Sequence, residues 1–174
     1  MGATFKSTQW TEDLRFFTPG AVPNFDVDYP MIVSLGAAYT GVQDWTFALD
    51  IRYFDYENTD GFREFGFSNV FSGAIGAQRR LNDCWHVRLG YNFNQNPISA
   101  SDALTNIVSP LIQEHNITGG ISYRFAKGVD ISLAYVYLFE NELTGPLPPL
   151  FGPGATMTHR LSAHSALVSV TVRY

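Results

Sequence analysis

Residues 115–125 read HNITGGISYRF, and this stretch decides the fold. Its residues alternate between two series. One series is apolar or glycine and the other is mostly polar: Ile117, Gly119, Ile121, Tyr123 and Phe125 against Asn116, Thr118, Gly120, Ser122 and Arg124. A period of two is the repeat of a β-strand, because successive side chains point to opposite faces of the sheet. The stretch is therefore predicted to be a strand with one apolar face.

The same alternation recurs along the chain. It is clearest in three further segments, 45–53, 85–93 and 129–139, and in the final run, 166–174. Two segments fit it less regularly, 29–40 and 71–81, and one short segment, 3–7, fits it weakly. Together with residues 115–125 these segments predict eight strands.

The connections between the predicted strands alternate in length. Three are compact turns, at 41–44, 82–84 and 126–128. The other four are long, at 8–28, 57–69, 95–113 and 140–160. Short turns at one end and long loops at the other are typical of outer-membrane barrels, whose periplasmic turns are tight and whose extracellular loops are extended.

Aromatic residues gather on the apolar face at both ends of the strands. The two groups are Trp45, Trp85 and Tyr174 at the short-turn ends, and Tyr53, Tyr91, Phe93, Tyr137 and Phe139 at the long-loop ends. They lie about nine residues apart, close to the length with which a tilted strand crosses the hydrocarbon. The sequence thus predicts an all-β, antiparallel transmembrane β-barrel of the bacterial outer membrane, with its apolar face against lipid. The aromatic end at Tyr174 resembles the terminal signal that barrel-assembly machinery recognises.

Composition argues against several other classes of protein. No run approaches the ~18 apolar residues of a membrane helix, and a formal net charge of -5 disfavours binding to nucleic acid. Cys84 is the single cysteine, so it forms no intrachain disulfide. The four histidines lack metal-ligand spacing, and no serine, histidine and aspartate suggest a nucleophile with its base. We expect no metal, no cofactor and no enzyme activity.

Two stretches resemble the FadL-type outer-membrane transporters. Residues 85–125, WHVRLGYNFNQNPISASDALTNIVSPLIQEHNITGGISYRF, resemble the family's Trp strand, Asn-Pro-Ile loop and Gly-rich return strand. Residues 29–56, YPMIVSLGAAYTGVQDWTFALDIRYFDY, are similar to a Pro-started strand, tight turn and Trp strand of the same family. The resemblance covers most of the chain.

This resemblance implies a function and a larger protein. Such transporters give passive passage to long-chain fatty acids and other hydrophobic compounds, through a 14-stranded barrel with an N-terminal hatch. The chain, residues 1–174, is then expected to be a single barrel unit from the C-terminal part. The signal peptide, hatch and early strands are expected to be missing from it.

The polar faces of the predicted strands suggest a substrate-binding site. Charged residues occupy the middle and the short-turn end: Asp50, Arg52, Arg88, Arg124, Asp130 and Arg173. Near the long-loop end four inward positions are apolar: Phe54, Tyr56, Val136 and Leu138. We predict that these four bind a hydrophobic ligand and that Arg52 meets its carboxylate. Two alternatives stay open, because loops could cover the apolar residues and the arginines could pair with Asp50 and Asp130.

Two other functions are compatible with the pattern. The first is a structural or adhesive barrel whose long loops bind external partners, since eight strands could close alone. The second is a soluble lipocalin-like barrel, which the aromatic girdles disfavour. The loop PLPPLFGPG, 146–154, offers Leu147, Leu150 and Phe151 either as a landing patch for hydrophobic substrate or as a packed lid.

Overall fold

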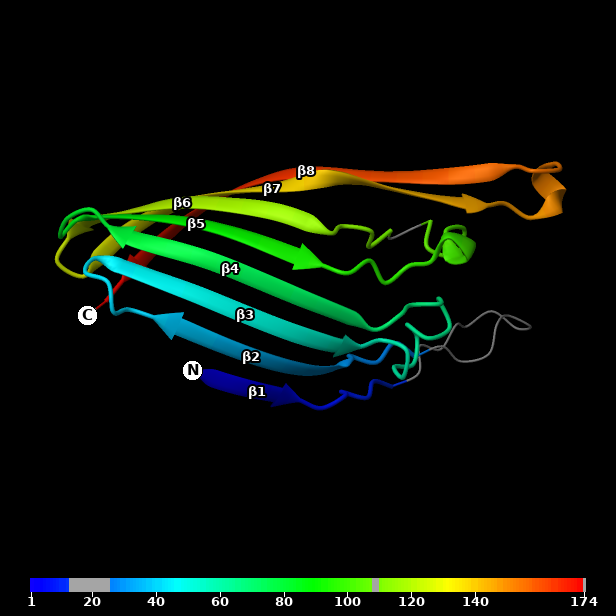
Figure 1. Cartoon of the computed structure of the whole chain (residues 1–174), viewed down its shortest axis with the longest axis horizontal. Helices are drawn as coiled ribbons and strands as arrows, with labels where there is room; N and C mark the ends of the chain where they lie inside the picture. Colours follow the sequence, from blue (N-terminus) through cyan, green and yellow to red (C-terminus); the bar gives the residue numbers. More distant parts are fainter. Residues whose placement is uncertain (13–25, 108–109, 174) are drawn as a thin grey trace.

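The computed structural model describes residues 1–12, 26–107 and 110–173, and its eight antiparallel strands form one sheet in chain order (Figure 1). The strands are β1 (Gly2–Lys6), β2 (Met31–Tyr39), β3 (Trp45–Asp55), β4 (Val70–Arg80), β5 (Trp85–Asn94), β6 (His115–Ala126), β7 (Val129–Pro146) and β8 (Thr156–Val172). Two 3-10 helices complete it, η1 (Ala100–Asp102) and η2 (Pro149–Phe151). Neither of these helices, nor any other part of the described chain, is a long apolar helix able to cross a membrane. The prediction of eight strands in an antiparallel all-β fold is confirmed.

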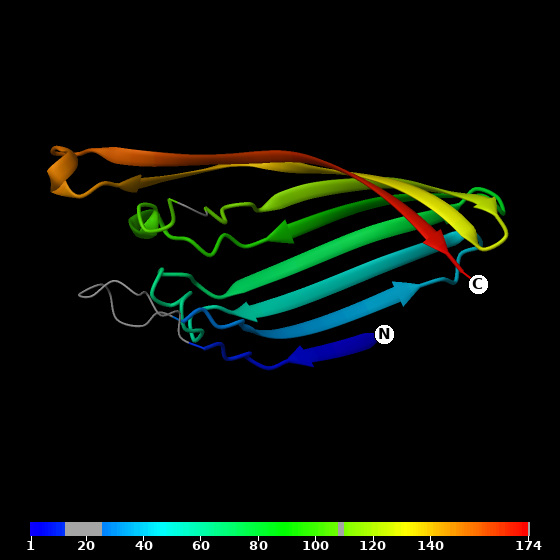
Figure 2. The same cartoon turned by 180° about the vertical axis from the view of Figure 1, so that it is seen from behind.

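The sheet is a curved array with all of its long loops at one end (Figures 1 and 2). The tight turns β2–β3, β4–β5 and β6–β7 lie together at the other end. Within the described residues, β1 and β8 are the two edges of the sheet, because each pairs with one neighbour. The hairpin of β7 and β8 projects beyond the other strands at the loop end.

Strand register separates an apolar column from a polar one. Ile121 lies opposite Val87 on β5 and Leu133 on β7, whereas Ser122 lies opposite His86 and Ser132. The apolar column is open to the surroundings: Leu89 is 69% exposed and Val168 is 71% exposed. A contiguous apolar face of this extent suits hydrocarbon and not water. We call it the outer face, and the opposite, polar side the inner face.

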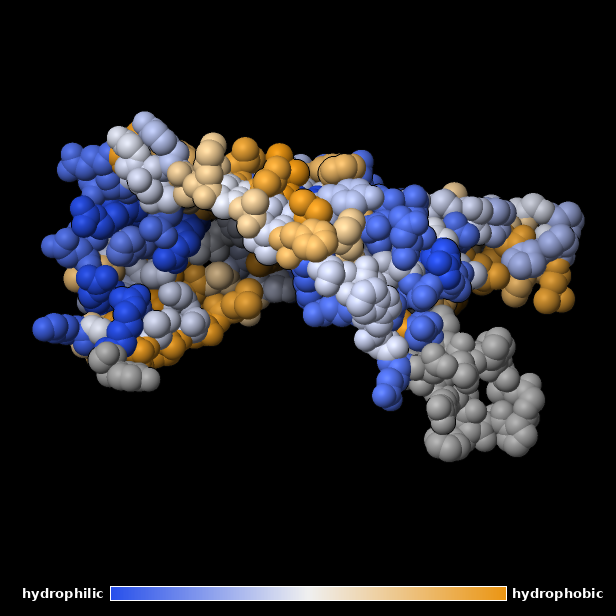
Figure 3. Space-filling view, turned by 90° about the horizontal axis from the view of Figure 1, so that it is seen from below, coloured by the Kyte–Doolittle hydropathy of each residue, from blue (hydrophilic) through white to orange (hydrophobic). Residues whose placement is uncertain are grey.

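The space-filling view separates the two kinds of surface (Figure 3). Hydrophobic residues run along the borders of the curved sheet, and hydrophilic residues gather at the short-turn end. The molecule is hollowed between those borders. This distribution is the reverse of a soluble lipocalin-like barrel, which would keep its apolar face inside.

Aromatic contacts mark both ends of the outer face. At the short-turn end Trp85 packs on Tyr123 with ring centroids 4.6 Å apart. At the loop end Tyr137 meets Phe139 edge-on at 4.9 Å. Such belts match the headgroup levels of a bilayer. Tyr174, assigned to the short-turn girdle from the sequence, lies outside the described residues.

The predicted long loop at 140–160 is wrong. Strand β7 runs on for 18 residues and β8 begins at Thr156, so the connection shrinks to residues 147–155. The cause is a bulge between Leu138 and Asn141, where β7 has one residue more than its partner. A bulge shifts the alternation by one position, which hides the continuing strand from a search for period two.

We predict that Leu133→Arg destabilises the inserted protein by ~2–4 kcal/mol, because the side chain would face hydrocarbon. Leu133 is 52% exposed on the outer face, opposite Ile121 and Val168. The matched control is Ala134→Arg on the inner face, which should cost about 1 kcal/mol or less. Urea titration of the full-length protein in lipid vesicles measures both. Equal losses for the two variants would contradict the face assignment.

Candidate functional site

Phe54 and Tyr56 lie together at the loop end of β3. Their rings stack with centroids 5.8 Å apart and planes 5° from parallel. Both line a cavity of about 240 Å³, which Val70 and Leu111 also border. Three amide side chains complete its wall, Asn94, Gln95 and Gln113. The structure thus brings two of the predicted ligand-binding residues into one partly polar cavity.

Tyr56 also belongs to a small hydrophobic core beneath the loops. Phe67, Ile98 and Ile112 are its buried members, and Phe62, Leu143 and Leu161 pack around it with Tyr56. Burial raises the pKa of the Tyr56 phenol. The loops therefore fold over part of the apolar inner wall, as one of the two sequence-based alternatives proposed.

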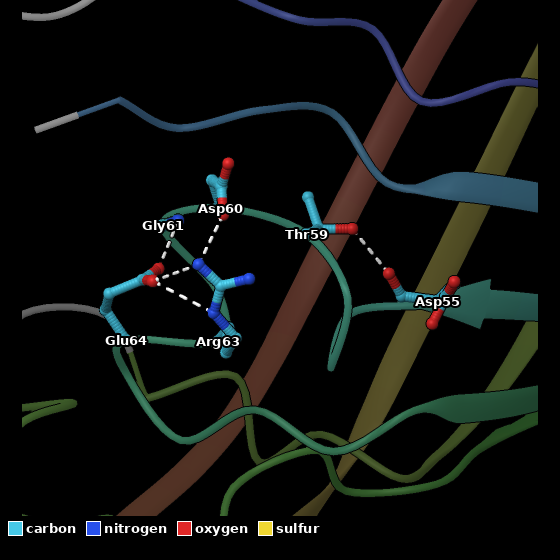
Figure 4. A network of polar contacts seen from close by, with 6 residues as sticks. All are labelled: Asp55, Thr59, Asp60, Gly61, Arg63 and Glu64. Carbon is cyan, nitrogen blue, oxygen red and sulfur yellow. Dashed lines mark hydrogen bonds and ion pairs between the residues drawn. The ribbon is translucent and has the colours of Figure 1, made fainter.

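The loop that contributes Phe62 and Phe67 is held by its own polar contacts (Figure 4). Arg63 bonds Asp60 at 2.5 Å and Glu64 at 2.8 Å, and the Gly61 N–H donates to Glu64 at 2.6 Å. The backbone N–H of Glu64, with Arg63 and Gly61, holds the pKa of the Glu64 carboxyl below its usual range. Gly61 has a φ of +88°, which favours glycine. This network fixes the loop that covers Tyr56.

A second loop packs against the β7–β8 hairpin. The His159 ring bonds the carbonyl oxygen of Ala103 at 2.7 Å, and the Asn141 amide donates to the carbonyl oxygen of Ile112 at 2.5 Å. At Gly145 a Cβ would overlap the Ala100 carbonyl oxygen, so only glycine permits this approach of η1. We call residues 56–69 and 95–113, excluding the undescribed positions 108 and 109, the loop cap.

Val136 and Leu138 lie on the inner face of β7 but away from this cavity. They stand opposite Thr118 and Asn116 of β6, and both are half-buried. Neither lines the cavity that Phe54 and Tyr56 border. Three strands separate β3 from β7, so the four predicted apolar residues form two pairs on one curved wall.

Arg52 is already paired. Its Nε donates to Asp50 Oδ1 at 3.1 Å and its Nη2 to Asp50 Oδ2 at 3.3 Å, a two-point contact within one strand. Both side chains keep substantial exposure, 54% for Arg52 and 38% for Asp50. A ligand carboxylate could meet Arg52 only in competition with Asp50.

The centre of the inner face is a wide hollow of 880 Å³. Its floor is built from small residues, among them Gly36, Ala48, Ala74, Gly76 and Gly90. At Gly90 a Cβ would lie 2.7 Å from Thr118 Oγ1, so the missing side chain gives room for the neighbouring strand. Small residues keep much of this part of the inner face low, between the longer side chains of Asp50 and Arg88 that also line the hollow.

The projecting hairpin ends in an apolar tip. Leu150 is 88% exposed and Phe151 is 58% exposed, at and beside η2. This arrangement fits the landing patch considered from the sequence better than the packed lid. Among the described residues no cluster of three or more histidine, cysteine or carboxylate side chains has the arrangement to hold a metal ion, and Cys84 is a free thiol.

Sequence reasoning missed the contribution of Asn141, Gly145 and His159 to the cap. All three lie in the segment that was predicted as loop, so their inward direction was not considered. After the bulge the odd-numbered residues of β7 face inward, and Leu143 reaches the hydrophobic core for the same reason. The available signal was the short alternation on either side of the loop, with Leu143 and Gly145 before it and Met157, His159 and Leu161 after it.

Comparison with known proteins agrees with the family resemblance of the two sequence stretches described above. A family described as "Outer membrane protein transport protein (OMPP1/FadL/TodX)" matches residues 20–174. No curated protein is similar enough in sequence to be matched to the chain.

Solved structures show the same fold at low sequence identity. The Pseudomonas putida toluene transporter TodX shares 20% identity over 87% of this chain and 37% of its own, with a TM-score of 0.57. A TodX monoaromatic hydrocarbon channel mutant, deltaS2S3, shares 19% over 89% and 40%, with a TM-score of 0.61. A Pseudomonas aeruginosa FadL homologue shares 16% over 83% and 35%, with a TM-score of 0.58. The chain therefore spans 35 to 40% of the length of these structures.

We predict that Gly145→Ala loosens the loop cap while the sheet still forms. The added Cβ would lie 2.6 Å from the Ala103 Cβ, and overpacking of this kind costs ~1–3 kcal/mol. Hydrogen exchange of residues 100–107 should therefore become faster. The control is Gly73→Ala, where a Cβ meets nothing within 4 Å. Unchanged exchange in Gly145→Ala would show that this contact does not hold the cap.

Proposed function

Because the chain belongs to the OMPP1/FadL/TodX family of outer membrane transport proteins, we propose that it forms part of a passive channel for long-chain fatty acids or other hydrophobic compounds. The proposed activity is passage and not catalysis. The observation that carries the proposal is the apolar inner wall at the loop end, where Phe54 and Tyr56 border a cavity. A channel for hydrophilic solutes would have a polar lumen there.

The cavity has the size for one apolar group. Its 240 Å³ exceeds the ~150 Å³ of an apolar cavity that binds benzene. It therefore accommodates an aromatic ring or a short section of an alkyl chain, with the rest of a longer molecule lying along the inner face. Each CH₂ removed from water there gains ~0.8 kcal/mol.

The chemistry of the solved relatives supports the broader class of substrate. One is described as a toluene transporter, another as a monoaromatic hydrocarbon channel, and a third as a FadL homologue. A single aromatic ring matches the stacked rings of Phe54 and Tyr56. Long-chain fatty acids remain our more specific proposal, because Arg52 offers a guanidinium near the same end of β3.

Arg52 would bind a carboxylate by exchange. Asp50 accepts from Nε and Nη2 in a two-point contact, so a ligand carboxylate would take the place of Asp50 at these donors. Both partners are partly exposed, so rearrangement does not strip a buried charge. Val136 and Leu138 are proposed to extend the apolar wall on the far side of the curved sheet.

An adhesive barrel is the second candidate function. The observation that favours it is the apolar tip of the β7–β8 hairpin, where Leu150 is 88% exposed. Exposed apolar groups on a projecting loop suit contact with an external protein or lipid. Normal uptake in the variants described below, combined with lost adhesion after Leu150→Asp, would favour this function.

We also propose two partners for the protein in the cell. The outer face is in contact with outer-membrane lipid. The barrel-assembly machinery is proposed to recognise the aromatic end at Tyr174, which lies outside the described residues.

Replacing Tyr174 with Asp should slow assembly more than it alters the finished barrel, because the aromatic end acts as a recognition signal in this proposal. Membrane insertion in cells is compared with unassisted refolding into detergent in vitro. Insertion at the wild-type rate in cells would eliminate this role for Tyr174.

Uptake of a hydrophobic substrate should fall several-fold in Phe54→Asp and Leu138→Asp, because each places a charge on the apolar wall. Uptake is measured in cells with the complete protein, using a long-chain fatty acid and toluene, with a small hydrophilic solute as reference. The matched control is Thr144→Asp, which adds the same charge at an exposed position of the β7–β8 hairpin outside the apolar wall and should leave uptake unchanged. If the folded Asp variants transport at the wild-type rate, these residues are only barrel wall.

A further inference from the structure

A second cavity lies on the inner face at the opposite end of the strands from the loop cap. Its volume is 260 Å³, and it extends from β4 across to the end of β8. Three arginines line it, Arg88, Arg124 and Arg173, together with the single carboxylate of Asp130. We call these four residues the basic cluster.

The basic cluster is positively charged in an acidic chain. Three arginines against one aspartate give it a formal charge of +2, whereas the whole sequence carries -5. His86 also lines the cavity and adds no negative charge. An excess of positive charge in a concave, partly enclosed site attracts anions.

Asp130 pairs with two of the arginines. Its Oδ1 lies 3.3 Å from Arg124 Nε, and its Oδ2 lies 2.6 Å from Arg173 Nη2. The carboxylate is the less exposed partner, with 16% of its side chain accessible against 44% for Arg124 and 63% for Arg173. Asp130 therefore fixes the two guanidinium groups while leaving much of each open to the cavity.

Arg88 has only neutral partners among the described residues. Its Nε donates to Gln78 Oε1 at 2.7 Å and its Nη1 to Ser122 Oγ at 2.5 Å. The Ser122 hydroxyl in turn bonds the Ser132 hydroxyl at 2.7 Å, which fixes its orientation. Two of the five N–H donors of Arg88 are thus used, which leaves three for a ligand. Its charge has no counterion within the described chain.

We propose that the basic cluster is a binding site for an oxyanion, either the carboxylate of an amphiphilic molecule or a free phosphate. The planar fork of Arg88 matches both in a two-point contact, and Arg124 adds a second cation. A volume of 260 Å³ holds an anion of this size with several waters. The short-turn end of an outer-membrane barrel is periplasmic, so the site lies where a solute leaves or enters the periplasm.

The proposal does not depend on passage of hydrophobic molecules. The cavity beside Phe54 and the basic cluster share no lining residue and lie at opposite ends of the strands. Loss of anion binding and loss of hydrophobic uptake are therefore separate results, measured on different variants.

Titration calorimetry on the full-length protein in nonionic detergent tests the proposal. The probes are inorganic phosphate, hexanoate and, as an uncharged counterpart, hexanol. Arg88→Gln keeps hydrogen-bonding capacity but removes the charge, and it should weaken binding roughly tenfold, the effect of one lost charge-assisted hydrogen bond. Arg124→Gln should also weaken anion binding, and it replaces Arg88→Gln as the test variant if Arg88→Gln does not fold.

The matched control is Arg80→Gln at the same end of the sheet. Arg80 pairs with Asp44, with Nη2 2.8 Å from Oδ1, and does not line the cavity. Its substitution should leave anion binding unchanged.

The two sources of anion give different patterns. If phosphate and hexanoate both bind, and Arg88→Gln weakens both, the site accepts free oxyanions. If hexanoate alone binds, with the same loss, the site serves the carboxylate of an amphiphile. The proposal is overturned if neither anion binds, if hexanol binds as tightly as hexanoate, or if the Arg88 and Arg124 variants keep wild-type affinity.

Discussion

The requirement that every backbone N–H and C=O be paired within the hydrocarbon governs this structure. Water is absent there, so strands survive only when each has a neighbour along its whole length. Seven consecutive antiparallel ladders pair the backbone groups between neighbouring strands, and among the described residues β1 and β8 each keep one unpaired edge. Because the ladders fix the register, they also fix which side chains face lipid and which face inward.

The two faces then follow different chemistry. The outer face carries a band of exposed apolar side chains between aromatic belts, as at Trp85 with Tyr123. The inner face is not in contact with lipid, and its polarity and side-chain size change along the strands. It is apolar under the loop cap, built of small residues in the centre, and basic at the short-turn end. A solute moving along it would meet three different environments in turn.

The loop cap depends on the same strands that cross the membrane. The bulge after Leu138 turns Asn141 and Leu143 inward, and the extended hairpin then offers Gly145 and His159 as a surface for η1. Without that shift in alternation the even-numbered residues of β7 would continue to face inward, and Asn141, Leu143 and Gly145 would face outward. One additional residue in β7 therefore determines how the cap is anchored, and the cap in turn limits how much of the wall around Tyr56 is accessible.

The sequence by itself determined the strand count, the antiparallel order, the outer face and the position of the tight turns. It could do so because the side-chain period of a strand is two and because lipid demands apolarity at every second residue. It missed the extension of β7 and β8, since a bulge interrupts that period.

Only the tertiary structure decided how the inner residues are grouped. The alternation in the sequence predicted that Phe54 and Leu138 both face inward. Sheet curvature and strand order place Phe54 beside Tyr56 and Leu138 beside Val136, on separate parts of the wall. Pairing of charges is likewise a matter of distance. Arg52 and Arg88 look alike in the sequence, yet Asp50 lies within reach of one and only neutral partners lie within reach of the other.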